Sequence, residues 1–416
     1  MKKILLFCLT ILFILQSSSA FALLFDRRPK PKAELSYFVY PVAGKLPGVQ
    51  EFSGYGASVI ALGGSETDIA AIKLGGPADY FENDDFEITL FTILDFPLYT
   101  EHLTLNAYKI DVINGTWPEG ERGINSDPDS TYYLLASTFS SSGAELSLNF
   151  WEYQLEFYYG YLDGSVTPYG LIDPTGKFYN AEEAKLIKKP RGYRWGIYLD
   201  DTDDRRDPRI GYRVQYEKWG MPATREGNSG FFQEDLNLTS YLPILDNNKG
   251  ILVLNYFFGS STVTEKGTVD RTQFICPTGA ADSCQTLLDD LYQRQVENAN
   301  RGKATSLGGA NRLRGYRTNR FYDSYTAFRG AEFRWYAFEA QEAFDFFVEK
   351  GTFAGFQLAL FAESGTVAPT KAELWDSTRT SYGFGLRPIF NTVVVRLDIG
   401  WSEEEKTTTL FFGYPF

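Results

Sequence analysis

Apolar and polar residues alternate along most of the chain, and the alternation is clearest in the last ten residues, Thr407–Phe416. Four large apolar side chains fall there at a spacing of two: Leu410, Phe412, Tyr414 and Phe416. This spacing places them on one face of a β-strand, which must be covered by a partner layer or by lipid. The residues Phe412, Gly413, Tyr414, Pro415 and Phe416 are therefore predicted to form the closing strand of a β-barrel.

The same alternation predicts an all-β fold, a transmembrane antiparallel β-barrel of sixteen strands. The expected strands are Ala33–Ala43, Glu51–Leu62, Thr67–Leu74, Phe86–Phe96, Glu101–Ile113, Ser130–Phe139, Ala144–Gly160, Arg191–Asp203, Ile210–Trp219, Phe231–Leu245, Gly250–Ser261, Tyr325–Phe338, Gly355–Val367, Ser381–Phe390, Thr392–Ser402 and Thr407–Phe416. With this count, the short turns fall on the periplasmic side and the long connections on the outer side. Glu339–Ala354 is the exception, because it is a long connection on the periplasmic side.

The N-terminus has the pattern of an export signal. Lys2 and Lys3 precede an apolar run, Ile4–Leu15, and the small residues Ala20 and Ala22 follow it. We expect residues 1–22 to be a signal peptide, 23–32 a short periplasmic segment and 33–416 the barrel. The alternative is an uncleaved anchor helix. Since no other segment approaches 18 consecutive apolar residues, membrane-spanning helices are not expected. On composition alone, the main alternative to a barrel is a large secreted β-sandwich.

Composition and charge narrow the function classes. Aromatic residues make up 16% of the chain and the net charge is −13, so an affinity for nucleic acid is not expected. Cys276 and Cys284 are close together, and in an exported protein this spacing favours a disulfide. The only histidine, His102, lies far from both and has no local Ser or Asp partner. We therefore expect no metal, no cofactor and no enzymatic activity.

The connection Thr262–Ser324, the sixth outer loop, is far longer than ordinary loops. It contains the two cysteines and then Thr286–Asn298, in which apolar residues recur at helical spacing. We expect a short helix, held by the disulfide over the mouth of the barrel. The alternative is a disordered loop.

The end of this loop, Leu307–Tyr316, contains the tripeptide Arg314-Gly315-Tyr316. Downstream follow Gly330–Trp335, Gly355–Val367, Tyr382–Arg387 and the aromatic last strand, and upstream stands Asp203–Tyr212. In this order and spacing, the elements resemble the barrels of the BamA/TamA superfamily, the bacterial surface antigen barrels. The tripeptide Arg-Gly-Tyr alone would be weak evidence, since it also occurs at Arg191–Tyr193. The resemblance covers residues 191–416 well and the first half by pattern only.

The resemblance implies that Arg314 folds back into the lumen and reaches two strands. Strand alternation points Glu332 and Glu363 inward, where the superfamily has its acidic partners. Each charge-assisted hydrogen bond would contribute about 1.5–3 kcal/mol. Gly315 would let the tip turn tightly and pass close to the wall. The family often has Asp where this chain has Glu363. The alternative is that Arg314, Glu332 and Glu363 are ordinary lumenal charges that do not contact one another. We interpret Arg396 and Asp398 as such lumenal lining.

The last strand also bears on mechanism. Pro415 has no N–H to donate, so the seam between the first and last strands should lack hydrogen bonds at its C-terminal end. Superfamily insertases are thought to open this seam, and a weak seam suits that role; fraying at a chain end is the alternative. The superfamily's periplasmic domains, which capture substrate, have no counterpart in the ten residues 23–32.

Together these features predict a barrel-only relative in the bacterial outer membrane that acts in membrane biogenesis or in transport of protein or lipid. Its expected partners are outer-membrane lipid, a periplasmic accessory protein and a barrel or lipid cargo. The alternative is a passive channel or structural surface barrel without insertase activity.

Overall fold

The computed structural model describes residues 35–45, 51–77, 85–100, 102–130, 132–172, 178–180, 191–223, 229–274, 282–346, 349–390 and 393–416. The strands are β1 Ser36–Lys45, β2 Glu51–Ile60, β3 Asp68–Pro77, β4 Asp85–Tyr99, β5 Leu103–Glu119, β6 Tyr132–Phe150, β7 Leu155–Ile172, β8 Phe178–Asn180, β9 Arg191–Thr202, β10 Gly211–Met221, β11 Gly230–Pro243, β12 Gly250–Glu265, β13 Tyr325–Phe346, β14 Glu349–Ala368, β15 Arg379–Phe390, β16 Val393–Trp401 and β17 Lys406–Phe412. The helices are α2 Asp282–Arg301 and the 3-10 turns η1 Leu62–Gly64, η2 Pro128–Ser130, η4 Asp246–Asn248, η5 Arg271–Gln273 and η6 Lys371–Glu373.

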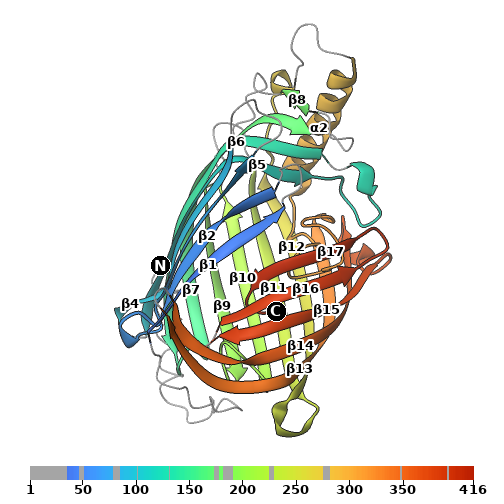
Figure 1. Ribbon diagram of the computed structural model, residues 1–416. Coiled ribbons are helices and arrows are strands. Elements are labelled where there is room, and N and C mark those ends of the chain that lie inside the picture. The colour runs from blue at the N-terminus through green and yellow to red at the C-terminus, as the bar shows by residue number, and fades with distance from the viewer. Residues whose placement is uncertain are drawn as a thin grey trace, which may run out of the picture.

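These strands form an antiparallel barrel, as the alternation predicts (Figure 1). Strands that follow each other in sequence pair with each other, with one exception around β8. The short β8 pairs with the end of β7, and the earlier part of β7 pairs with β9. Thirteen strands form a closed ring of pairings, and β15 to β17 continue the sheet beyond β14, which gives the predicted total of 16 when β8 is left out. The ring closes through one pair, Tyr37 of β1 with Lys350 of β14.

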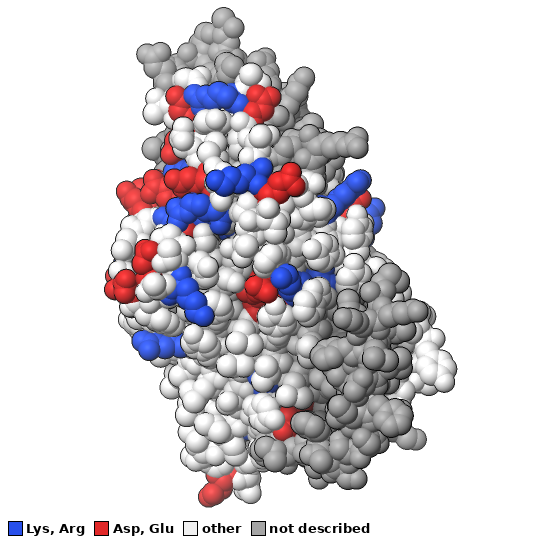
Figure 2. Space-filling view, turned by 180° about the vertical axis from the view of Figure 1, so that it is seen from behind, with Lys and Arg blue, Asp and Glu red and all other residues white. Residues whose placement is uncertain are grey.

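Side chains alternate between the lumen and the outer surface. On β13, Glu332 and Arg334 are fully buried while Trp335 is 42% exposed, and on β14 Gln357 is buried while Leu360 is 61% exposed. Figure 2 shows that charged side chains gather in the upper part of one face, while its lower part is mostly uncharged. The upper end of the molecule, which carries α2 and β8, is called the loop end below, and the opposite end the turn end (Figure 1).

Several predicted boundaries are wrong; for example, the expected strand Ala144–Gly160 is divided between β6 and β7. Residues Ser140–Gly143, which separate the expected strands Ser130–Phe139 and Ala144–Gly160, lie inside β6, where Ser140 pairs with Asp111 and Gly143 with Tyr108. A Cβ atom on Gly143 would lie 2.5 Å from the Tyr108 ring, so this glycine makes room for a cross-strand aromatic side chain. Likewise Glu339–Ala354 is mostly strand, because β13 and β14 run on toward the turn end.

The last strand differs most from the prediction. β17 ends at Phe412, and Gly413 has a left-handed φ of 81°, a conformation that glycine adopts at little cost. The chain then turns into the lumen, where the Tyr414 hydroxyl donates a hydrogen bond to Asp207 over 2.6 Å. The Phe416 ring packs on Phe328 with centroids 6.3 Å apart. Residues Tyr414, Pro415 and Phe416 therefore do not continue the closing strand.

The helix α2 includes and extends the predicted helix Thr286–Asn298. Within the described ranges, no helix is long and apolar enough to cross a membrane. The predicted signal peptide, the segment 23–32 and Cys276 lie outside the described residues. Cys284 is buried in the first turn of α2, and its predicted disulfide with Cys276 stays a prediction.

Candidate functional site

The loop between β12 and β13 is folded so that its end returns to the inside of the wall. Leu307 and Phe321 bond to each other through both backbone N–H groups, at 2.8 and 3.1 Å, and so form a narrow hairpin. Its side chains bury against the wall in a cluster made of Ile124, Phe257, Leu307, Leu313, Tyr316, Phe321, Phe328 and Val367. Apolar burial thus positions the tip, which carries Arg314.

Arg314 is held by carboxylates from three strands. Its Nε donates to Glu363 Oε1 over 2.7 Å, and its Nη1 donates to Glu332 Oε2 over 2.8 Å and to Asp398 Oδ2 over 2.7 Å. Its backbone N–H also donates to Glu363 Oε2 over 2.7 Å. The guanidinium carbon lies 3.6 Å from the centroid of the Phe361 ring, a cation–π distance. We call Arg314, Glu332, Glu363 and Asp398 the loop lock.

Further arginines from the wall bind the same carboxylates. Arg387 makes a bidentate contact with Glu332, with both N–O distances 2.7 Å, and Arg334 Nε donates to Glu332 Oε1 over 2.7 Å. Arg396 Nη1 lies 3.5 Å from Asp398 Oδ2. All these groups are buried, and buried charges need such partners because burial without them is costly. Removing one partner of such a network costs about 3–5 kcal/mol.

The electrostatics of the tip follow from this arrangement. Burial alone would lower the pKa of Arg314, but the carboxylates of Glu363, Glu332 and Asp398 outweigh it and raise that pKa. The guanidinium of Arg314 therefore stays charged across the ordinary pH range.

The tip approaches the wall very closely at two glycines. A Cβ atom on Gly315 would lie 2.5 Å from the carbonyl oxygen of Trp401, and one on Gly400 would lie 2.5 Å from that of Arg314. The left-handed φ in the tip belongs to Leu313, at 52°, and not to Gly315. Gly315 thus provides the close approach that the sequence predicts, but not the tight turn.

The structure brings Arg314, Glu332 and Glu363 together, the three residues that sequence reasoning grouped. Tyr316 lies instead inside the loop, where its ring contacts Phe321 edge-on at 5.0 Å. Asp398 was interpreted as plain lining, and Arg387 received no role. Strand alternation alone could have pointed Arg387 inward, but the contact of Asp398 depends on how far the tip reaches.

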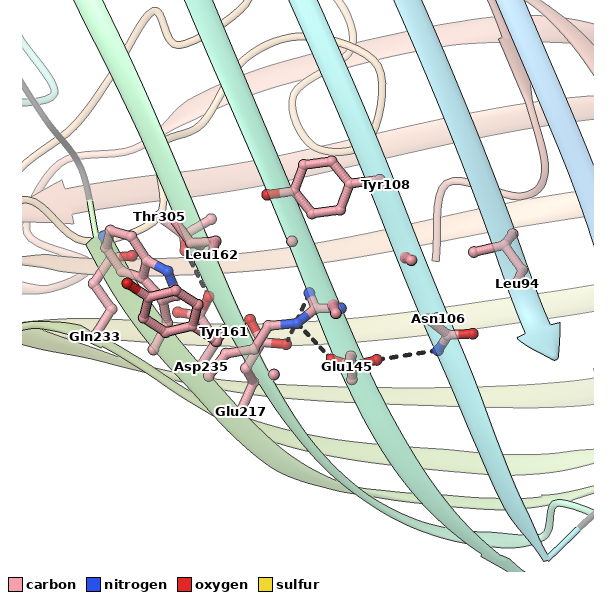
Figure 3. Close-up of a pocket in the computed structure, with 16 residues that line it drawn as sticks. Leu94, Asn106, Tyr108, Glu145, Tyr161, Leu162, Glu217, Gln233, Asp235 and Thr305 are labelled. Carbon is pink, nitrogen blue, oxygen red and sulfur yellow. Dashed lines mark hydrogen bonds and ion pairs between the residues drawn. The ribbon is translucent and has the colours of Figure 1, made fainter. Parts of the chain in front are cut away.

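The opposite part of the wall lines an open part of the lumen. A cavity of about 500 Å³ lies between β4 and β11, bordered by Tyr108, Glu145, Arg194, Glu217, Asp235 and Thr305 (Figure 3). Arg194 Nε donates to Glu145 over 2.6 Å and its Nη1 lies 3.7 Å from Glu217. Within the described part of the chain, no group of His, Cys, Asp or Glu could hold a metal ion. His102 Nδ1 lies 3.1 Å from the carbonyl oxygen of Asn149 at the turn end.

The seam between the first and last strands has no described backbone ladder. β17 pairs with β16, and β1 pairs with β2 and, at one position, with β14. The two strands meet through side chains, since the Tyr40 and Phe412 rings have centroids 5.5 Å apart. At the loop end, the hairpin of β16 and β17 is tied to the loop by glutamates: Arg320 Nε donates to Glu404 over 2.7 Å, and Arg317 N donates to Glu405 over 2.8 Å.

These features define the class of the protein as an antiparallel β-barrel with an arginine-held loop in its lumen. Among solved structures, CdiB from Escherichia coli is similar, with a TM-score of 0.53, 11% identity, and coverage of 92% of this chain and 62% of CdiB. BamA from Haemophilus ducreyi lacking POTRA domains 1-3 gives a TM-score of 0.48 at 11% identity and covers 92% and 70% of the two chains. CdiB from Acinetobacter baumannii gives 0.49 at 10% and covers 93% and 60%.

The likeness to CdiB from Escherichia coli agrees with the predicted β-barrel fold. The chain spans between 60% and 70% of the length of these solved chains. No protein-family model matches the chain, and no curated protein sequence matches it.

Proposed function

We propose that this chain is a bacterial outer-membrane barrel that acts in membrane biogenesis or in transport of protein or lipid. The observation that supports this most directly is the seam, because β1 and β17 expose strand edges that are not joined by a described ladder. An edge of this kind is available to pair with another chain. The loop lock supports the proposal too, since it ties the lumenal loop to β13, β14 and β16 beside that seam.

The expected partners follow from this role. Lipid would cover the apolar outer surface, and a barrel or lipid cargo would enter at the seam. A periplasmic accessory protein would deliver the cargo. The proposal assigns the chain no enzymatic step.

The test closes the seam with a crosslink. Cysteines at Tyr40 and Phe412, whose ring centroids are 5.5 Å apart, would join β1 to β17 when treated with a short bifunctional thiol reagent. The control pair, Leu397→Cys with Leu410→Cys, crosslinks β16 to β17, which are already paired. We expect cells that carry the seam cysteine pair, but not cells that carry the control pair, to lose the same barrels, surface proteins or lipids as a deletion strain. Quantitative outer-membrane proteomics and lipid analysis would measure this loss. An unchanged envelope after deletion would contradict the proposal.

One observation favours a second function, a passive channel. The cavity of about 500 Å³ is lined by charged and aromatic side chains, as a water-filled lumen would be. Steady ion conductance of the unaltered protein in a planar bilayer would support this alternative.

A further inference from the structure

The turn between β9 and β10, Asp203–Ile210, contains three arginines in eight residues, and all three contact the barrel wall at the turn end. Arg205 Nη1 donates to Asp95 of β4 over 2.8 Å, and its guanidinium lies 4.4 Å from the Tyr153 ring. Arg206 Nη2 lies 3.1 Å from Asp68 and 3.4 Å from Glu66. Thus one short turn is tied to three different parts of the wall on that side.

The third arginine reaches in the other direction. Arg209 Nη1 lies 2.7 Å from Glu339 of β13, and its guanidinium stacks on the Tyr336 ring at 3.9 Å. Asp207 of the same turn accepts hydrogen bonds from the hydroxyls of Tyr336 and Tyr414. The turn therefore bonds to both sides of the barrel and to the C-terminal tail.

The order of the strands shows how far these contacts extend. In the closed ring, β3 lies six strands from β10 by way of β4 to β9, and seven strands away by way of β14 and β1. Since β3 and β10 are thus on opposite sides of the ring, the contact from Arg206 to Asp68 crosses the lumen.

The turn is also internally fixed. Asp203 Oδ1 accepts from the N–H groups of Arg209 and Ile210 at 2.8 and 3.0 Å. Asp204 Oδ1 accepts from the N–H groups of Arg206 and Asp207 at 2.7 and 2.9 Å. These side-chain contacts replace a backbone ladder, as in Asx turns, so the segment keeps its shape without pairing to a neighbouring strand.

We propose that the turn Asp203–Ile210 is a plug that closes the turn end of the lumen, separately from the loop lock. The cavity described above lies between the two. Thr305 of the loop borders it, and the adjoining cavity of about 240 Å³ is lined by Glu156, which lies 3.9 Å from Arg205 of the turn. Two barriers in series then separate the lumen from the two ends. This inference does not depend on the proposed role in biogenesis.

The test measures ion conductance of the full chain in planar bilayers. Arg314→Ala loosens the loop, so that the turn is the remaining barrier. The plug variant adds Arg205→Gln, Arg206→Gln and Arg209→Gln to it. The control adds Arg191→Gln, Arg271→Gln and Arg329→Gln, which remove the same charge from exposed positions. Folding of each variant is checked by the compact form on unheated gels.

We expect the plug variant to conduct at least about tenfold more than Arg314→Ala alone, because an unplugged polar lumen is a water-filled channel. The control should match Arg314→Ala. Equal conductance of the plug variant and Arg314→Ala would overturn the proposal. If the plug variant does not fold, Arg205→Gln with Arg206→Gln removes the contacts of the turn to β4 and β3, and unchanged conductance of this pair in the Arg314→Ala background would overturn the proposal equally.

Discussion

Arginines hold two segments inside the lumen, the loop tip and the turn Asp203–Ile210, and the arginines of the two segments differ in burial. In the loop lock, the Arg314 side chain is 0% exposed and its carboxylates come from β13, β14 and β16. In the turn Asp203–Ile210, the side chains of Arg205, Arg206 and Arg209 are 20%, 21% and 13% exposed, and their partners are spread around the ring.

The difference separates two uses of the same chemistry. A fully buried network is costly to break, since a lone charge would remain in a low-dielectric site. Partly exposed pairs are screened by salt and water, and each one contributes less. The lock therefore suits a loop that must stay in place. The contacts of the turn are weaker and more numerous, which suits a barrier whose contacts can be broken one at a time.

The largest expected effect is that of Glu332→Gln. Glu332 is the common partner of Arg314, Arg334 and Arg387, so its loss leaves these buried cations with too few carboxylates. Breaking a buried network costs about 3–5 kcal/mol for one partner, and this change affects three arginines. We expect a marked fall in the temperature at which the compact form on gels is lost. Glu342→Gln, at an exposed position of the same strand, should leave that temperature unchanged.

Next in size is Arg314→Ala. Glu332 retains Arg387 and Arg334, and Asp398 retains Arg396, so the barrel should assemble while the loop tip detaches. Arg320 is 2% exposed in the intact protein, so we expect trypsin to cleave after it only in the variant, as mapped by mass spectrometry. Arg329→Ala serves as the control, because Arg329 is exposed on β13. Protease resistance equal to that of the parent protein would refute docking by Arg314.

The sequence predicts more of this lock than of the seam, for physical reasons. Strand alternation decides which side chains face inward, so Glu332 and Glu363 could be assigned from local sequence. Asp398 was assigned inward as well, but its contact with Arg314 depends on the depth of the loop. That depth is set by apolar packing and by the approach of Gly315 to Trp401, which no local pattern encodes.

The tail shows the limit of alternation more clearly. Leu410, Phe412, Tyr414 and Phe416 have strand spacing, yet Gly413 turns the last two into the lumen. There Tyr414 finds Asp207 and lies under Arg334, whose guanidinium is 3.8 Å from the ring centroid. A tertiary hydrogen bond and a cation–π contact thus override the local pattern. The turn Asp203–Ile210 lies in the family-like motif Asp203–Tyr212, but its reach across the ring could not be derived from sequence.

A smaller effect is expected from Glu363→Asp. Glu363 accepts from both the backbone N–H and the Nε of Arg314, and from Ser381 Oγ at 2.8 Å. A side chain one methylene shorter cannot reach all three donors, and losing one or two such bonds costs about 1–3 kcal/mol. We expect trypsin cleavage after Arg320 at a rate between those of the parent and Arg314→Ala. Cleavage as fast as in Arg314→Ala would show that the methylene is essential for docking.

The smallest effect distinguishes the turn from the lock directly. Arg206→Gln removes two partly exposed ion pairs that share one guanidinium nitrogen, so we expect a loss of at most about 1 kcal/mol of stability. Because salt screens such pairs, the loss should vanish when unfolding by urea is repeated in about 1 M salt, where the Debye length is roughly 3 Å. The loss caused by Glu332→Gln should persist, since its partners are fully buried. Arg191→Gln, from a pair whose side chains are 63% and 48% exposed, sets the baseline for an ordinary surface contact. A salt-independent loss in Arg206→Gln would mean that the turn is held by buried charge, as the lock is.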